Sequence, residues 1–350
     1  MTLLLTNHEV EQVLTMDLCL GTIEDAFREL ARGKAVNRPR SHTYMINDNP
    51  DDFYVFKSVE GGVSKLQVYA IRLTSDRVVN RIVHGVSRRE KLPAAPGGKY
   101  FGLILLMSTE TCEPLCILPD GFLQRMRVGA TYGIAAKYLS RENSTNVGIF
   151  GAGGQAEAQL AAVCAVRNIT RVRVFSRRVE NRTRFAERMT NRLQVEVLPV
   201  DSPMAAIEES DIVIAATNSH EPVFDSGWLN NGTHVSFLQD REVDDLLLKK
   251  ADIIATDTKQ RVTDWVMGNT APRESFGRFN YEAYNHVYDL GQIIIGLVPG
   301  RESQQQITVF RAPGVGIQFA SVGQRVFEEA KKKRLGRDIP TEWFLEDPHS

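Results

Sequence analysis

The chain has 350 residues, of which 43% are hydrophobic and 24% are charged, and its formal net charge is −1 at pH 7. The length favours two domains, and the near-neutral charge argues against nucleic acid and against a membrane surface as partners. The N-terminus has no basic region of a secretory signal, the apolar runs are too short to span a bilayer, and the four cysteines are scattered. We therefore expect a reduced cytoplasmic protein with no metal site.

In the first part of the chain, the pattern of apolar residues predicts one long helix, a strand-rich region and a second helix. Apolar residues recur at helical spacing over 7–33. Residues 40–118 hold β-branched and aromatic runs that are separated by Gly, Pro and Asp, with a polar loop expected at 88–98. An alanine-rich helix is predicted over 119–140, after Pro119-Asp120-Gly121.

After residue 145, short apolar strands alternate with helical stretches. The expected strands carry the sequences NVGIF, RVRVFSR, VEVLPV, DIVIAAT, THVSFL and DIIATD, and a final helix follows within 314–336. This alternation is typical of βαβ units. The second part of the chain is therefore predicted to hold a parallel sheet.

The segment NVGIFGAGGQAEAQL at 146–160 joins the end of a strand to a G-x-G-x-x-A pattern that opens a helix. Such a loop is typical of a dinucleotide site, because its glycines allow a tight turn and close approach of a pyrophosphate to the helix N-terminus. Ligands of such sheets bind at strand carboxyl ends, so the turn after DIVIAA should face the nicotinamide, unless it is an ordinary polar turn. The cofactor-binding residues predicted here are Gly151, Gly153, Gly154, Gln155, Ala156, Thr217, Asn218 and Ser219.

The end of the next strand indicates which dinucleotide binds. NAD sites place an acidic residue there, but this chain has Ser176, Arg177 and Arg178. A hydroxyl and two guanidiniums suit a 2′-phosphate, so we predict NADP, with NAD as the alternative. A solvated basic turn is the competing interpretation of the arginines.

The segment TCEPLCILPDGFLQRMRVGATYGIAAKYLS at 111–140 resembles the hallmark segment of the ornithine cyclodeaminase/μ-crystallin family. Members commonly show a T-G-x-P-L-A run, a D-G turn, an R-T-A/G-A helix start and a GAGxQA fingerprint. Cys112 and Val128 depart from the family's usual Gly and Thr. Segments near both ends also fit, so the resemblance covers nearly the whole chain. The matching residues are Pro114, Leu115, Asp120, Gly121, Arg127, Ala130 and Gln155.

The resemblance implies an α/β fold with a Rossmann-type doubly wound parallel sheet and an α+β substrate and dimerisation domain. Residues 1–125 with 320–350 would form the substrate-binding and dimerisation domain, and residues 126–319 the Rossmann domain. Known members act at the α-carbon of amino acids or their imines, and their reactions vary. A homodimer is implied in the same way.

Cations are expected to hold the carboxylate of such a substrate, because a guanidinium binds a planar acid through two parallel hydrogen bonds. By family match the binding residues are Arg127, Arg40 and Lys65, and Lys65 could also move a proton. Arg38 is a close rival of Arg40, and Lys57 replaces Lys65 if the register is different. Each of these cations could instead lie at the surface.

The predicted acid–base residue is Asp240, which follows a G-x-H strand as a catalytic aspartate does in the cyclodeaminases. The spacing is one residue shorter than the family pattern, and Asp240 could instead cap the following helix, ahead of Asp244 and Asp245. His234 lies inside the strand and is predicted to be a packed core residue.

Together these features predict an NAD(P)-dependent oxidoreductase acting at the Cα–N bond of an amino acid or imino acid, of the ketimine reductase or amino-acid dehydrogenase type. The alternatives are a cyclodeaminase that releases ammonia with bound NAD, and a nucleotide- or ligand-binding protein without activity. The run YAIRLTSD replaces the family's K-x-V-x-x-x-P-x-N continuation, so the substrate side chain stays open.

Overall fold

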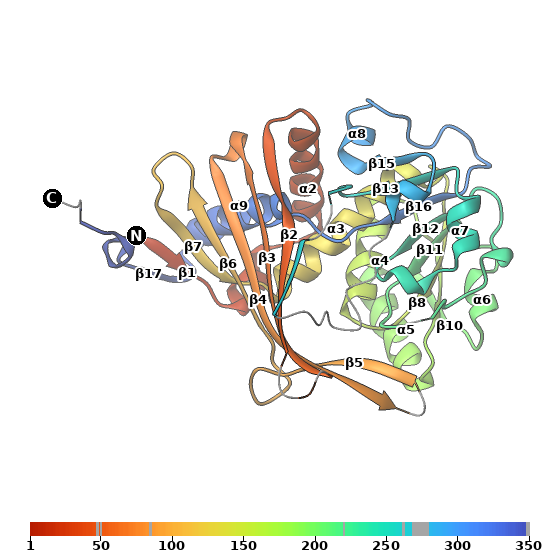
Figure 1. The fold of residues 1–350 in the computed structure, drawn as a ribbon. Helices are drawn as coiled ribbons and strands as arrows, with labels where there is room; N and C mark the ends of the chain where they lie inside the picture. The colour runs from red at the N-terminus through yellow and green to blue at the C-terminus, as the bar shows by residue number, and fades with distance from the viewer. Residues whose placement is uncertain are drawn as a thin grey trace.

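The computed structural model describes residues 1–46, 49, 51–83, 86–219, 221–260, 263–267 and 280–347, and describes only the backbone within 82–89. Two β-sheets lie side by side, with helices packed between and around them (Figure 1). In this described part of the chain, no helix is long and apolar enough to cross a membrane.

The first sheet is mainly antiparallel and has the strand order β14-β2-β3-β4-β6-β7-β1-β17, with β5 paired to β4. Residues 86–92 form the edge strand β5, which overlaps the loop predicted at 88–98, so the loop prediction was wrong for 88–92. Between Val86 and Leu92 this segment is polar, and it lacks the alternation that marks a half-buried strand. The strands are β1 (Thr2–Leu4), β2 (Ala35–Ile46), β3 (Asp52–Val63), β4 (Val68–Val83), β5 (Val86–Leu92), β6 (Phe101–Ser108), β7 (Pro114–Pro119), β14 (Thr263–Val266) and β17 (Arg337–Ile339).

Helices α1 (Asn7–Val13), α2 (Met16–Ala31) and α9 (Gly316–Lys332) pack with this sheet. The helix predicted over 7–33 is therefore two helices, because Thr15 accepts a hydrogen bond from Leu18 N at 3.2 Å and starts a new helix. Helix α9 comes very close to β3, since a Cβ at Gly316 would lie 1.8 Å from Glu60 O.

The second sheet is parallel throughout, in the order β10-β9-β8-β11-β12-β16-β13-β15. It has a separate apolar core on each face: Val147 and Ile149 of β8 face one, and Phe150 faces the other. The predicted Rossmann-type sheet is thereby confirmed. Its strands are β8 (Asn146–Phe150), β9 (Arg171–Phe175), β10 (Glu196–Pro199), β11 (Ile212–Ala215), β12 (His234–Phe237), β13 (Ile253–Thr256), β15 (Val287–Asp289) and β16 (Thr308–Arg311).

The helices of this half are α3 (Gly121–Leu139), α4 (Gly154–Val166), α5 (Val179–Leu193), α6 (Pro203–Ile207), α7 (Asp245–Lys250) and α8 (Leu290–Ile294). Strand β16 enters the sheet between β12 and β13, and the chain then returns to the first sheet as α9. The division into domains at 125/126 and 319/320 stays a prediction.

Helix α3 lies between the two halves and packs on α4 almost backbone to backbone. A Cβ at Gly129 would lie 2.6 Å from Ala158 O, and one at Gly133 would lie 2.7 Å from Ala162 Cβ. The spacing between the two helices is therefore set by the lack of side chains at these positions.

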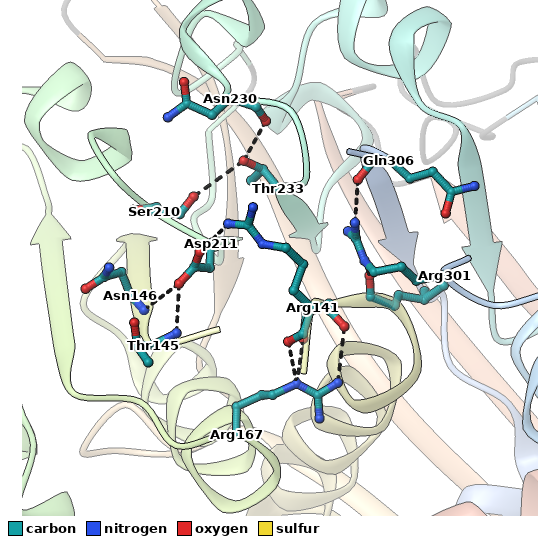
Figure 2. Close-up of polar contacts among 12 residues, drawn as sticks. Arg141, Thr145, Asn146, Arg167, Ser210, Asp211, Asn230, Thr233, Arg301 and Gln306 are labelled. Carbon is teal, nitrogen blue, oxygen red and sulfur yellow. Dashed lines mark hydrogen bonds and ion pairs between the residues drawn. The ribbon is translucent and has the colours of Figure 1, made fainter. Parts of the chain in front are cut away.

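Arginines fix the C-terminal end of α3 to the start of the parallel sheet (Figure 2). Arg167 donates to Lys137 O at 2.6 Å, and Arg301 donates to Leu139 O at 2.7 Å. Asp211 pairs with Arg141 and also accepts the backbone N–H groups of residues 145 and 146 at 2.7 and 3.0 Å. The bonds from Arg167 and Arg301 satisfy carbonyls in the last turn of α3, where the helix itself supplies no donor.

Candidate functional site

A cavity of about 1040 Å³ lies between the first sheet, α3 and the carboxyl ends of β12 and β16. Open parallel sheets bind their ligands at this edge. The lining residues used below are Arg40, His42 and Lys57 from the first sheet, Gln124 and Arg127 from α3, Gln155 from α4, and Gln239 and Arg311 from the strand ends.

Arg127 is almost fully buried, with 4% of its surface exposed, and its guanidinium lies 4.8 Å from the centre of the Phe319 ring. Burial and repulsion by Arg72 lower the pKa of Arg127 to about 10, so the group is charged at neutral pH. Gly314 makes room for it: φ is +92° there, and a Cβ would lie 2.5 Å from Arg127 Nη1.

Arg40 also lines the cavity, and it lies within an irregularity in the pairing of β2 with β3, between residues 38 and 41. Bulges of this kind redirect a side chain. The Arg40 Nη1 atom donates to Pro313 O, and burial together with repulsion from Arg72 and Arg127 lowers its pKa to about 9. Its rival Arg38 is exposed and pairs with Glu60 at 2.9 Å, outside the cavity lining.

Lys65 does not line this cavity, so its predicted place beside the substrate stays a prediction that the cavity does not support. It lies in a 3₁₀ turn (Ser64–Leu66) and is exposed in a surface groove beside α2. Lys57, the alternative register, lines the cavity instead. Its Nζ atom lies 3.0 Å from Asp76 Oδ2, and Lys91 Nζ lies 2.5 Å from the other carboxylate oxygen of Asp76.

Asp240 lies in the 3₁₀ turn after β12 (Asp240–Glu242) and pairs with Arg311 Nε at 2.8 Å. Burial raises the pKa of Asp240, against the opposing effect of Arg311. The carboxylate is not among the groups that line the cavity, whereas Arg311 is. The competing expectation that Asp240 caps the next helix was wrong, because Asp244 accepts the Leu247 N–H at 2.9 Å.

His234 is fully buried and contacts Thr308 Oγ1 through Nδ1 at 2.9 Å. Burial and repulsion by Arg301 and Arg167 lower its pKa to about 3, so the ring is neutral. This is the environment expected of the core histidine that the sequence predicts.

Sequence reasoning missed two buried acids near the strand ends. Asp257 accepts the Gly314 N–H at 2.7 Å, and burial raises its pKa to about 6. Glu242 accepts from Thr217 Oγ1 at 2.6 Å and from Leu238 N at 2.8 Å, so it joins the turns after β11 and β12. Asp257 directly follows an apolar strand, a signal that could have identified it.

The glycine loop has the geometry that a phosphate site needs. Gly151 has φ +104° and a Cβ there would lie 2.3 Å from Ala216 O, so the turn requires glycine. Gly153 is the N-cap of α4, and a Cβ there would meet open space. Gly154 is the first residue of the helix and lies beside Arg125. Ala156, in the first turn of α4, is fully buried, whereas Gln155 lines the cavity.

The other predicted cofactor residues follow β9 and β11. Ser176 is half-buried, and Arg177 and Arg178 are exposed just before α5. After β11, Asn218 is exposed, whereas Thr217 and Ser219 are half-buried and joined by a 3.1 Å hydrogen bond. Their roles toward a dinucleotide stay predictions.

A sequence model of the ornithine cyclodeaminase/mu-crystallin family matches residues 1–334. The chain belongs to this family. Alanine dehydrogenase from Archaeoglobus fulgidus is 29% identical over 344 residues, which cover 97% of this chain and 98% of that protein.

Solved structures of the ornithine cyclodeaminase/mu-crystallin family agree with the fold described above. Δ1-Pyrroline-2-carboxylate reductase from Thermococcus litoralis, in complex with NADH and L-proline, matches with a TM-score of 0.77 and 29% identity, over 97% of this chain and 100% of that one. An archaeal alanine dehydrogenase dimer with bound NAD matches with a TM-score of 0.77 and 26% identity, over 97% and 98% of the two chains.

These relatives are oxidoreductases acting on carbon–nitrogen groups. The predicted family and enzyme class are confirmed, and a nicotinamide dinucleotide is the cofactor of these structural neighbours. The choice between NADP and NAD stays a prediction.

Proposed function

We propose that this chain catalyses hydride transfer at the Cα–N bond of an amino acid or imino acid with NAD(P) as cofactor. The observation that carries the proposal is the position of Arg40 and Arg127. Both line a cavity that also reaches Gln155 at the start of α4 and the carboxyl end of β16. A carboxylate-binding pair thus adjoins the edge where a parallel sheet binds dinucleotides.

In this proposal Arg127 and Arg40 bind the substrate carboxylate and fix the α-carbon toward the parallel sheet. A bound nicotinamide supplies or accepts the hydride. The protein's contribution is orientation, since hydride transfer requires the donor and the acceptor carbon to be in near-attack contact.

Lys57 takes the role that the sequence gave to Lys65. Reduction of an imine leaves an amine whose nitrogen needs a proton, and an ammonium can supply one at neutral pH more readily than a guanidinium. Asp76 holds the Lys57 ammonium at 3.0 Å. Asp240 is then a positioning residue, because its carboxylate orients Arg311 at the cavity wall.

Ser176, Arg177 and Arg178 are proposed to bind the 2′-phosphate of NADP, since all three follow β9 at the edge of the predicted dinucleotide site. We further propose a cytoplasmic homodimer. The related archaeal alanine dehydrogenase is a dimer, and it matches this chain over 97% of its length.

The test is a panel assay on the purified protein. NADPH or NADH is offered with keto acids plus amines, with cyclic imino acids and with basic amino acids, and absorbance at the nicotinamide band is followed. Net oxidation of the nicotinamide supports the proposal. Ammonia release without net absorbance change would mean a cyclodeaminase, and nucleotide binding without turnover would mean a non-catalytic binding protein.

A further inference from the structure

The guanidinium of Arg127 is already bonded to two neutral amide oxygens. Gln124 Oε1 accepts from Arg127 Nε at 2.9 Å and from Nη2 at 2.5 Å, and Gln318 Oε1 accepts from Nη1 at 2.7 Å. The Nε/Nη2 edge that Gln124 covers is one at which a carboxylate binds an arginine in bidentate fashion.

The two glutamines differ in how firmly they are held. Gln318 is fully buried, and its side chain also accepts from Val315 N at 3.1 Å and donates to Thr131 Oγ1 at 2.6 Å. Gln124 lines the cavity and is half-buried. Within the described residues, the Gln124 side chain is bonded only to Arg127, so it can rotate away at the cost of those bonds alone.

Without Gln124, an empty site would leave the Nε/Nη2 edge of Arg127 without an acceptor, in a cavity that it shares with the cation Arg40. Buried charged donors without acceptors are costly. The Gln124 oxygen removes that cost until a ligand arrives.

We propose that Gln124 is a displaceable stand-in for the substrate carboxylate: its amide occupies the Arg127 fork in the empty site and leaves when an ionised carboxylate binds. This rests on the proposed role of Arg127. A carboxylate offers one oxygen to each of the two N–H groups and adds the attraction between opposite charges, whereas the amide offers a single neutral oxygen to both, so a carboxylate displaces the amide. A carboxamide or ester offers only a neutral oxygen and gains nothing by the exchange. Gln124 therefore sets the selectivity for free acids.

The test compares Gln124→Ala and Gln124→Glu with the wild type, with Gln324→Ala as control. Gln324 is a half-buried glutamine of α9 that bonds Glu328 at 3.0 Å and does not line the cavity. With the substrate found in the panel assay, Gln124→Ala should lower KM about 5- to 20-fold, because no internal acceptor competes for hydrogen bonds to a charged group. Gln124→Glu should raise KM at least about 10-fold, because a tethered carboxylate competes. We expect kcat at saturation to stay within about 3-fold in both.

A second readout needs no turnover. Thermal unfolding of the ligand-free protein should give the highest Tm for Gln124→Glu, an intermediate Tm for the wild type and the lowest Tm for Gln124→Ala. Sodium formate, compared with sodium chloride at equal ionic strength, should raise Tm most in Gln124→Ala and least in Gln124→Glu. Unchanged KM and unchanged formate shifts in an active enzyme would overturn the role of Gln124 and leave the proposed function intact. A wild type that oxidises no nicotinamide with any substrate would instead overturn the proposed function, and equal formate shifts in all variants would still refute the stand-in.

Discussion

Replacing Lys57 by Gln tests the site most directly, because the sequence alone favours Lys65. The Lys57 ammonium lies 3.0 Å from Asp76, which is 3% exposed. The substitution leaves Lys91 Nζ 2.5 Å from the same carboxylate, so Asp76 stays paired. We therefore expect a loss of only about 1–2 kcal/mol in unfolding free energy, measured by urea denaturation.

The effect on catalysis should be much larger. A hydrogen bond from a charged group contributes about 1.5–3 kcal/mol, or about 10- to 150-fold in kcat/KM, and loss of a general acid costs about 10²–10⁴-fold in rate. Lys57→Gln should thus lower kcat/KM at least about 100-fold. Lys65→Gln, the matched control on an exposed turn, should change it less than about 2-fold.

Initial rates of nicotinamide oxidation with the substrate from the panel assay give these numbers. Lys57→Arg keeps the charge but releases a proton poorly, so it should keep KM near the wild-type value and lose kcat. The reasoning is refuted if Lys57→Gln, folded by circular dichroism, keeps wild-type kcat/KM, or if Lys65→Gln is the variant that loses it.

Three further predictions concern stability and cofactor choice. Burial raises the pKa of Asp257 to about 6, so the folded state binds this proton more tightly than the unfolded state. The resulting stabilisation is present below pH 4 and is lost as the pH rises through 6. Relative to Asp257→Asn, the unfolding free energy of the wild type, measured with urea, should fall by about 3 kcal/mol between pH 4 and 7. A difference between the two proteins that does not depend on pH would contradict this. Asp211→Ala leaves Arg141 and two backbone N–H groups without their acceptor, so the unfolding free energy should fall by about 2–4 kcal/mol; a loss below 1 kcal/mol would show that water replaces the carboxylate. Replacing Arg177 and Arg178 together by Ala should lower kcat/KM for NADPH at least about 10-fold and leave NADH within about 2-fold; equal losses with both cofactors would exclude 2′-phosphate recognition.

The parallel sheet and its glycine loop were predictable because their signals are local. A strand, two glycines and a helix start follow one another within 146–160, and each residue's role depends on near neighbours. The same holds for α3, which begins and ends within two residues of its predicted bounds.

The sequence could not show that Lys57, and not Lys65, lies in the cavity. In the sequence, Gly61 and Gly62 indicate a break between two strands, and such a break would place Lys65 in the second strand. Both glycines instead lie inside β3, where a Cβ at Gly61 would be 2.6 Å from Ile317 N of α9. Gly61 therefore makes room for a helix more than 250 positions away, and the turn falls at Lys65.

Other contacts of the site are long-range for the same reason. Arg72 on β4 bonds Asp120 at the start of α3 at 2.5 Å. Arg311 reaches the cavity from β16, a strand that the sequence analysis did not predict. Such pairings depend on tertiary packing, and no spacing in one sequence reveals them.

The close contact between α3 and α4 has a consequence for the reaction. Arg127 is carried by α3, while α4 begins at the loop expected to hold the pyrophosphate. The spacing between the two helices, which Gly129 and Gly133 allow to be short, therefore sets the distance between the acid-binding group and the coenzyme. A methyl group at either glycine would increase the distance between α3 and α4 by part of an ångström. Since a misplacement of about 1 Å can cost on the order of 100-fold in rate, two residues that touch neither reactant would govern turnover.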